Sequence, residues 1–147
     1  MFSSILVPDD FSHGANHALR LAIRVARASK GSITLLHVGM APGVPVVDTY
    51  GVPVPPIFPE MVDDFAKERR HAIDRLAREE IPEDVPWRAV VRDGYPPEEI
   101  VAEAGSDAGY DLLVMGTHGR TGLARVVLGS VTERVLRSCP IPVLVTK

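Results

Sequence analysis

A glycine-rich segment followed by hydroxyl-bearing residues is the part of the sequence best suited to binding an anion. Its residues of interest are Gly116, Gly119, Gly122, Gly129, Ser130, Val131 and Thr132. Glycines permit positive φ and a close approach of the backbone to a ligand. Free amides at the start of a helix near residue 130, together with the positive end of the helix dipole, form an arrangement that binds phosphate. The segment therefore predicts a phosphate site.

Other side chains of the same segment can add charge, and they also allow a structural alternative. Arg120 and Arg125 are cationic, and His118 could face a phosphate. Ser130 and Glu133 have the S-x-x-E spacing of a helix capping box, which requires no ligand, although a cap can share its N–H groups with an anion. The segment is not a P-loop, because no Lys-Ser or Lys-Thr follows the glycines, and it lacks the G-x-G-x-x-G dinucleotide fingerprint.

A pair of carboxylates, Asp9 and Asp10, follows the first apolar run and Pro8. Carboxylates at the end of a strand can hold Mg²⁺ or accept hydrogen bonds from ribose hydroxyls. The alternative is that one or both order the turn into the next helix, for which Ser12 is an equally good cap. Asp10 is the candidate Mg²⁺ ligand of the pair.

The remaining reactive side chains are expected to be structural. His13 and His17 lie four residues apart on a predicted helix, but the sequence shows no third metal ligand. His37 lies inside an apolar run, so we expect a hydrogen-bonded core histidine. Cys139 has no evident activating partner, so we expect an inert thiol.

Short apolar runs alternate with helical patterns along the chain. Strands are predicted at Ser3–Val7, Ser32–Val38, Trp87–Arg92, Asp111–Met115 and Pro142–Thr146, and helices at Ala15–Ser29, Glu60–Glu80, Pro96–Ala104 and Ser130–Ser138. This order predicts an α/β fold, a single doubly wound five-stranded parallel sheet with helices on both faces. Such sheets bind ligands outside the carboxyl ends of their strands, where both candidate groups fall.

The pattern of predicted elements and turns indicates one domain over residues 1–147. Residues 39–59 hold six of the thirteen prolines and three glycines, which predicts a long surface loop. The strand at Trp87–Arg92 alternates and places Arg88 and Arg92 on one face. This pattern predicts an edge strand with water beside it.

Composition excludes several classes of protein. With 46% hydrophobic and 24% charged residues, the chain is not expected to be disordered as a whole. The longest apolar runs are far shorter than the ~20 residues that span a bilayer, so no membrane partner is expected. The start shows no secretory signal and the chain has one cysteine, which together predict a reducing, cytoplasmic location. A net charge of −3 argues against a nucleic-acid partner.

Over its whole length the sequence resembles the universal stress protein family, in its ATP-binding branch. The spacing G-x2-G-x9-G-S is present at Gly116, Gly119, Gly129 and Ser130. The start Ile5-Leu6-Val7-Pro8-x-Asp10-x-Ser12, the run Leu35-Leu36-His37-Val38, the run Asp111–Gly116 and the end Cys139–Val145 also match. Asp9 stands where the family usually has Val or Thr, which adds charge near the site.

The resemblance implies a Rossmann-like fold, similar to the adenine nucleotide alpha hydrolases, with strand order 3-2-1-4-5. It implies that Val38 and Met115 line an adenine slot, that Pro8 and the backbone of Asp9 close it, and that Asp10 lies near the ribose. The implied phosphate cradle consists of Gly116, Gly119, Gly129, Ser130, Val131 and Thr132. The implied ligand is ATP or AMP, with Mg²⁺ as a candidate ion. The resemblance also implies a homodimer formed through Pro142–Thr146.

Three functions follow from these residues. The favoured one is a cytoplasmic, dimeric adenine-nucleotide-binding module of the stress response, with binding favoured over catalysis. The second is a phosphoacceptor receiver domain with Asp9 and Asp10 as its acidic pair, Asp93 as the acceptor and Thr117 as the switch. The third is a slow ATP hydrolase, for which Asp10 and His118 are the candidate general bases.

Overall fold

Five strands and four helices alternate along the chain. The computed structural model describes residues 1–39, 59–117 and 128–147. The strands are β1 (Ser4–Pro8), β2 (Ser32–Gly39), β3 (Trp87–Asp93), β4 (Leu112–Gly116) and β5 (Val143–Thr146), and the helices are α1 (His13–Ser29), α2 (Pro59–Glu80), α3 (Pro96–Ala104) and α4 (Ser130–Ser138). Every predicted element is present, with ends that differ by at most a few residues. The predicted long loop falls on residues 40–58, outside the described ranges.

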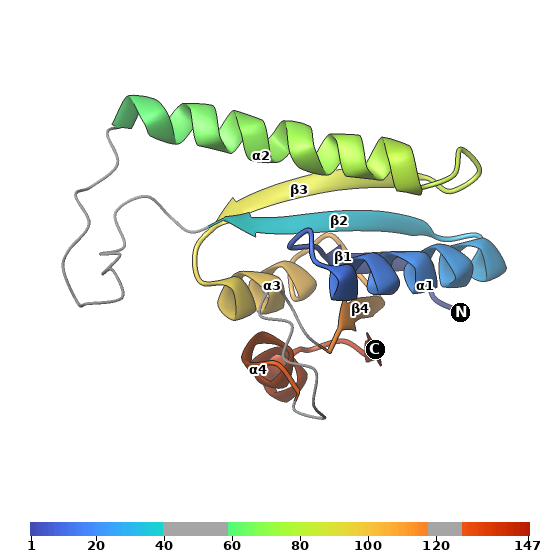
Figure 1. The fold of residues 1–147 in the computed structure, drawn as a ribbon. Coiled ribbons are helices and arrows are strands. Elements are labelled where there is room, and N and C mark those ends of the chain that lie inside the picture. Colours follow the sequence, from blue (N-terminus) through green and yellow to red (C-terminus); the bar gives the residue numbers. More distant parts are fainter. Residues whose placement is uncertain (40–58, 118–127) are drawn as a thin grey trace.

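The strands form one parallel sheet of order β3-β2-β1-β4-β5, as expected (Figure 1). β1 is therefore paired on both edges, and the direction of the strand order reverses between β1 and β4. In open α/β sheets such a reversal opens a crevice at the carboxyl ends of the strands. Asp9 and Asp10, which follow β1, and Gly116, which ends β4, lie on either side of this point.

Alternate residues of the strands bury two separate cores. In β1, Ile5 and Val7 belong to the core beneath α1 and α2, whereas Leu6 belongs to the core beneath α3 and α4. The helices thus cover both faces of the sheet (Figure 1). Side chains at the strand ends can reach the same ligand only if they lie on the same face of the sheet.

The predicted edge position of β3 is confirmed, but its arginines are not simply solvated. Arg88 donates hydrogen bonds to Thr34 Oγ1 at 3.0 Å and to the Tyr110 hydroxyl at 2.8 Å. Arg92 Nε donates to Glu103 Oε2 at 2.7 Å, and the Tyr110 hydroxyl donates to Glu103 Oε1 at 2.6 Å. A connected polar network therefore joins the edge strand to α3.

Local chemistry explains where the elements begin. Ser12 caps α1, because its hydroxyl oxygen accepts a hydrogen bond from the Ala15 amide at 3.2 Å, so the helix starts two residues earlier than predicted. β5 starts at Val143 because Pro142 has no N–H to donate. The Pro142 carbonyl still accepts from the Leu113 amide at 2.9 Å. None of the described helices is long and apolar enough to span a membrane.

Candidate functional site

Three of the predicted nucleotide contacts meet at the carboxyl edge of the sheet. Val38 is the penultimate residue of β2 and Met115 that of β4, and both belong to the core beneath α3 and α4. Pro8 ends β1 between these two strands and is half-buried. The structure thus places an apolar surface at the strand ends, on the face of the sheet that α3 and α4 cover.

The start of α4 is open, and the predicted capping box is wrong. Gly129 is the N-cap residue and Ser130 is the first helical residue, so Ser130 lies one position too late for its hydroxyl to cap the helix. Within the described residues no side chain caps α4. The amides of Ser130, Val131 and Thr132 belong to the first turn, where a helix offers N–H groups without helical partners. Ser130 is exposed, which leaves its hydroxyl at the surface.

Hydrogen bonds hold this open turn against the end of β4. The Gly129 amide donates to the Thr117 carbonyl at 2.8 Å, and the Thr117 amide donates to the Thr146 carbonyl at 2.8 Å. Thr132 is buried, and its hydroxyl donates to the Gly116 carbonyl at 2.9 Å. The Thr132 proton is therefore used inside the fold, and this residue can offer a phosphate only its amide N–H.

Gly119 of the predicted cradle and the other candidate residues of the glycine-rich segment lie outside the described residues. These are His118, Gly119 and Arg120, together with Gly122 and Arg125. Their predicted roles stay predictions. Thr117 and Gly129 lie on either side of this part of the sequence, and the hydrogen bond from the Gly129 amide to the Thr117 carbonyl joins them.

The glycines that the structure describes at this site do not need positive φ, contrary to the expectation from sequence. Gly129 has φ −61° and ψ 148°, a conformation open to any residue. Gly116 is not among the described glycines with positive φ. A Cβ on Gly116 would instead lie 2.7 Å from the Gly14 carbonyl oxygen, so Gly116 is required by the close approach of α1 to β4.

Asp9 is buried at the end of β1, and most of its polar atoms are used inside the protein. Its amide donates to the Leu36 carbonyl at 2.8 Å, and its carbonyl accepts from His37 Nδ1 at 2.8 Å. Its Oδ1 accepts the Phe11 amide at 2.7 Å, whereas Oδ2 is buried without a hydrogen-bond partner in the described part of the chain. Asp9 is 4% exposed.

This environment changes the acidity of Asp9. The pKa of Asp9 is raised from 3.8 to about 6, chiefly by burial; the hydrogen bond from the Phe11 amide lowers this pKa and the neighbouring charge of Asp10 raises it, both by less than burial does. An ionised Asp9 therefore destabilises the folded protein. A buried carboxylate of this kind is often found at a functional site.

The sequence alternative in which the acidic pair orders a turn is also confirmed. Asp10 Oδ1 accepts the Ser12 amide at 3.1 Å, so both aspartates hydrogen-bond to the backbone two residues further along the chain. Asp10 is only half-buried and stays near the surface. Among the described residues no group of three or more histidine, cysteine or acidic side chains is placed to hold a metal ion.

His37 is the buried, hydrogen-bonded core histidine that the sequence predicts. His17 Nδ1 lies 3.1 Å from the main-chain oxygen of Lys147. Residue type does not predict the conformation of Phe11, which has φ 62°, a left-handed conformation that is rare for an aromatic residue.

The receiver-domain interpretation is wrong. A receiver has the flavodoxin-like strand order 2-1-3-4-5, with its third strand inside the sheet, whereas β3 lies at the edge here. The proposed acceptor Asp93 is held in an ion pair by Arg69 of α2. The carboxylate of Asp93 is therefore occupied in a different role.

Comparisons with known proteins agree with this architecture. A model of the Universal stress protein family matches residues 1–147. Universal stress protein MJ0577 of Methanocaldococcus jannaschii is 32% identical over 164 aligned residues, which cover 100% of this chain and 96% of that protein. Its solved structure superposes with a TM-score of 0.78, covering 100% and 96% of the two chains.

Two further solved structures share the fold and hold nucleotides. One is a universal stress protein in complex with cAMP, with 21% identity, a TM-score of 0.64 and coverage of 99% of this chain and 97% of that one. The other is the universal stress protein from Archaeoglobus fulgidus in complex with dAMP, with 20% identity, a TM-score of 0.62 and coverage of 100% and 98%.

The packing of Gly116 gives a first testable prediction. Gly116→Ala should lower the free energy of unfolding by about 1–3 kcal/mol, because the new methyl group would meet the backbone of Gly14. Gly105→Ala is the matched control, since its Cβ would have no neighbour closer than 3.4 Å. Urea unfolding of both variants measures the difference, and equal stabilities would contradict the close approach of α1 to β4.

The buried carboxylate gives a second prediction. The pKa of Asp9 is higher in the folded than in the unfolded chain, so its contribution to the free energy of unfolding grows as pH falls from about 7 to about 4. This contribution should reach up to about 3 kcal/mol and should be absent in Asp9→Asn. Urea unfolding across this pH range, with the wild type minus the variant taken at each pH, measures it.

Asp84→Asn provides a control of opposite sign for that experiment. The hydrogen bond from Arg27 lowers the pKa of Asp84, so any stability from this exposed ion pair is lost, not gained, as pH falls. A difference curve for Asp9→Asn that is flat or that slopes like the Asp84 curve would contradict the assignment of a raised pKa to Asp9.

Proposed function

The chain belongs to the universal stress protein family, and from this premise we propose that it binds an adenine nucleotide, ATP or AMP, and acts in the stress response by binding and not by catalysis. The observation that carries the proposal is the open first turn of α4 beside the apolar strand ends. An uncapped helix start favours a negatively charged ligand through its N–H groups and the helix dipole. Apolar side chains beside it favour a base.

In the proposed complex the nucleotide runs along the carboxyl edge of the sheet. Val38, Met115 and Pro8 contact the adenine, and the half-buried Asp10 lies near the ribose. The amides of Ser130, Val131 and Thr132 bind the phosphates, with Gly116, Gly119, Gly129, His118 and Arg120 completing the cradle. The backbone of Asp9 supports the base only by contact, because its N–H and C=O groups are already hydrogen-bonded.

The comparisons support an adenine nucleotide as the class of ligand, and an experiment can identify which nucleotide binds. Both nucleotides named for the two complexes, cAMP and dAMP, carry adenine and one phosphate. Mass spectrometry of the nucleotide released by denaturing freshly purified protein identifies the resident ligand. Titration with and without Mg²⁺ then shows whether Asp10 contributes through an ion.

We also propose a homodimer through β5 in a reducing cytoplasm. β5 is an edge strand paired only with β4, and Val143, Leu144 and Val145 are half-exposed. Because the carbonyls of Pro142 and Thr146 accept hydrogen bonds from the β4 side, the backbone groups of Val143 and Val145 face the open edge. An open edge of this kind can pair with a second copy of the strand.

Ser130 offers a direct test of the phosphate amides. Ser130→Pro removes the N–H and the hydroxyl, yet proline is well tolerated at the first helical position, and Gly129 already has the extended conformation that must precede proline. Ser130→Ala removes the hydroxyl alone. We expect Ser130→Pro to weaken ATP and AMP by about tenfold or more and Ser130→Ala by only a few-fold.

Calorimetric titration with ATP, AMP and adenosine measures these effects, and circular dichroism checks the fold. Adenosine has no phosphate, so its affinity should not change in either variant. Wild-type affinity for ATP in a folded Ser130→Pro protein would contradict the phosphate site at α4, and with it most of the proposed function.

The dimer has its own test. Val145→Pro removes one outward-facing N–H of β5 and should give a folded monomer, since proline is tolerated on edge strands but cannot donate to a new partner. Phe65→Lys on α2 is the control, because it removes an exposed apolar side chain away from β5. Sedimentation velocity reports the mass, and a Val145→Pro protein that remains dimeric would place the interface elsewhere.

A further inference from the structure

The turn between β1 and α1 is held by three residues that contact one another, which we call the Asp9 interlock: Asp9, Phe11 and His37. Asp9 Oδ1 accepts the Phe11 amide at 2.7 Å, and the Asp9 carbonyl accepts from His37 Nδ1 at 2.8 Å. The rings of Phe11 and His37 are tilted against each other with centroids 4.8 Å apart. Each member of the interlock therefore contacts the other two.

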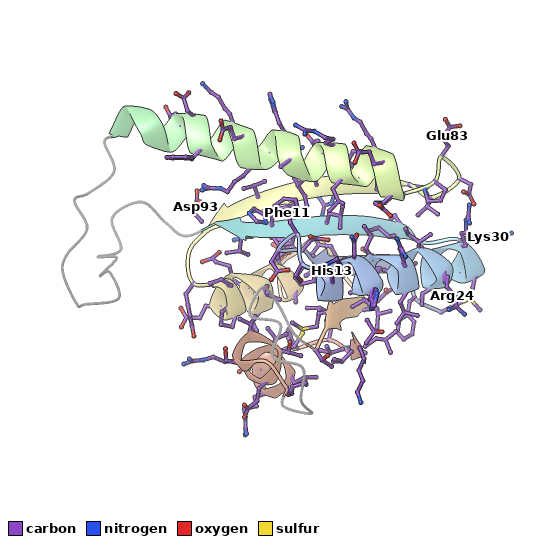
Figure 2. All side chains as sticks on the ribbon, in the orientation of Figure 1. Phe11, His13, Arg24, Lys30, Glu83 and Asp93 are labelled. Carbon is purple, nitrogen blue, oxygen red and sulfur yellow. The ribbon has the colours of Figure 1, made fainter. Side chains whose placement is uncertain are left out.

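The interlock holds a strained backbone. Phe11 has φ 62°, which places a bulky residue in the left-handed region, an unfavourable conformation for a residue with a side chain. Phe11 is also 43% exposed, so burial of its ring does not account for the conformation. Figure 2 shows Asp93 at the end of the molecule where β2 and β3 finish, Lys30 and Glu83 at the opposite end, and Phe11 between them. Phe11 comes two residues after Asp9, whose amide continues the β1 ladder, so the strain lies just beyond the carboxyl end of β1.

The interlock lies on the opposite face of the sheet from the proposed base contacts. The amide of Asp9 continues the β1 ladder to Leu36, so the Asp9 side chain falls on the same face as Val7, which α1 and α2 cover. His37 alternates with Val38 in β2, and Val38 packs on the other face. The Asp9 carboxylate therefore acts on a nucleotide through the backbone and not by touching the base.

We propose that Asp9 is a positioning residue for the nucleoside end of the site, an inference that rests on the proposed function. Its hydrogen bond to the Phe11 amide keeps Phe11 left-handed, and this turn sets the direction in which Asp10 leaves the strand. Its carbonyl fixes His37, next to Val38. The base and ribose contacts on β1 and β2 are thereby held in one arrangement, while the phosphate contacts on α4 do not depend on it.

The burial of Asp9 separates this role from a role in stability. Oδ2 is buried without a hydrogen-bond partner among the described residues, and burying an unpaired oxygen lowers the stability of the folded protein. An apolar residue of similar size should fold at least as well, because it removes a buried charge. A residue that only stabilised the fold would give the opposite result on substitution.

Two substitutions of Asp9 test the proposal by calorimetric titration with ATP, AMP and adenosine. Asp9→Val cannot accept the Phe11 amide, and we expect all three ligands to weaken by the same factor, about tenfold or more, with no loss of stability to urea. Asp9→Asn keeps an acceptor at Oδ1 and should bind all three ligands within about threefold of the wild type. Equal loss for adenosine and ATP distinguishes this defect from that of Ser130→Pro, which spares adenosine.

A second substitution at Phe11 tests whether the backbone conformation is the cause. Glycine adopts positive φ without strain, so Phe11→Gly combined with Asp9→Val should recover most of the affinity that Asp9→Val alone loses. Phe11→Val in the wild-type background should weaken binding instead, since a β-branched residue resists the left-handed region.

The possible failures are distinct. A wild type that binds none of the three ligands overturns the proposed function, and this inference with it. A wild type that binds, with a folded Asp9→Val variant that binds equally well, overturns only the role of Asp9. An Asp9→Val variant that loses stability and affinity together, with no recovery from Phe11→Gly, assigns Asp9 to folding and also overturns the positioning role.

Discussion

The close contact between the first turn of α1 and the end of β4 is the constraint on which the rest of this site depends. Gly116 has no side chain, so the backbone of Gly14 can lie against it. This contact brings the first turn of α1 to the end of β4, beside the point where the strand order reverses. Thr132 then bonds to the Gly116 carbonyl and places the start of α4 beside them. The site is thus assembled by backbone packing before any ligand contact is considered.

The fold could be predicted from the sequence because its signals are local and repeated. Alternation of apolar runs with helical patterns predicts a parallel sheet, and the two arginines of β3 mark an edge. What the pattern could not show is how those arginines are used. Arg88 and Arg92 meet Tyr110 and Glu103, which lie further along the chain, and only the folded sheet brings them together.

The site was predicted in part, and the errors have physical causes. The S-x-x-E spacing suits a capping box beginning at Ser130, but the Gly129 carbonyl already accepts the Glu133 amide at 2.9 Å while the Gly129 backbone is extended, so Gly129 is the cap. The sequence predicts positive φ at the glycines of the site. In the structure Gly116 and Gly129 lack it, and Phe11 has it instead. A hydrogen bond to Asp9 imposes that conformation, and residue propensity gives no indication of it.

The two ends of the proposed site are controlled by separate parts of the chain. The nucleoside end depends on the turn after β1 and on β2, which the Asp9 interlock ties together on the face that α1 and α2 cover. The phosphate end depends on the start of α4, which Thr117 and Gly116 tie to β4 on the other side of the strand reversal. A ligand that spans both ends would connect β2, β1 and β4 across the point where the strand order reverses.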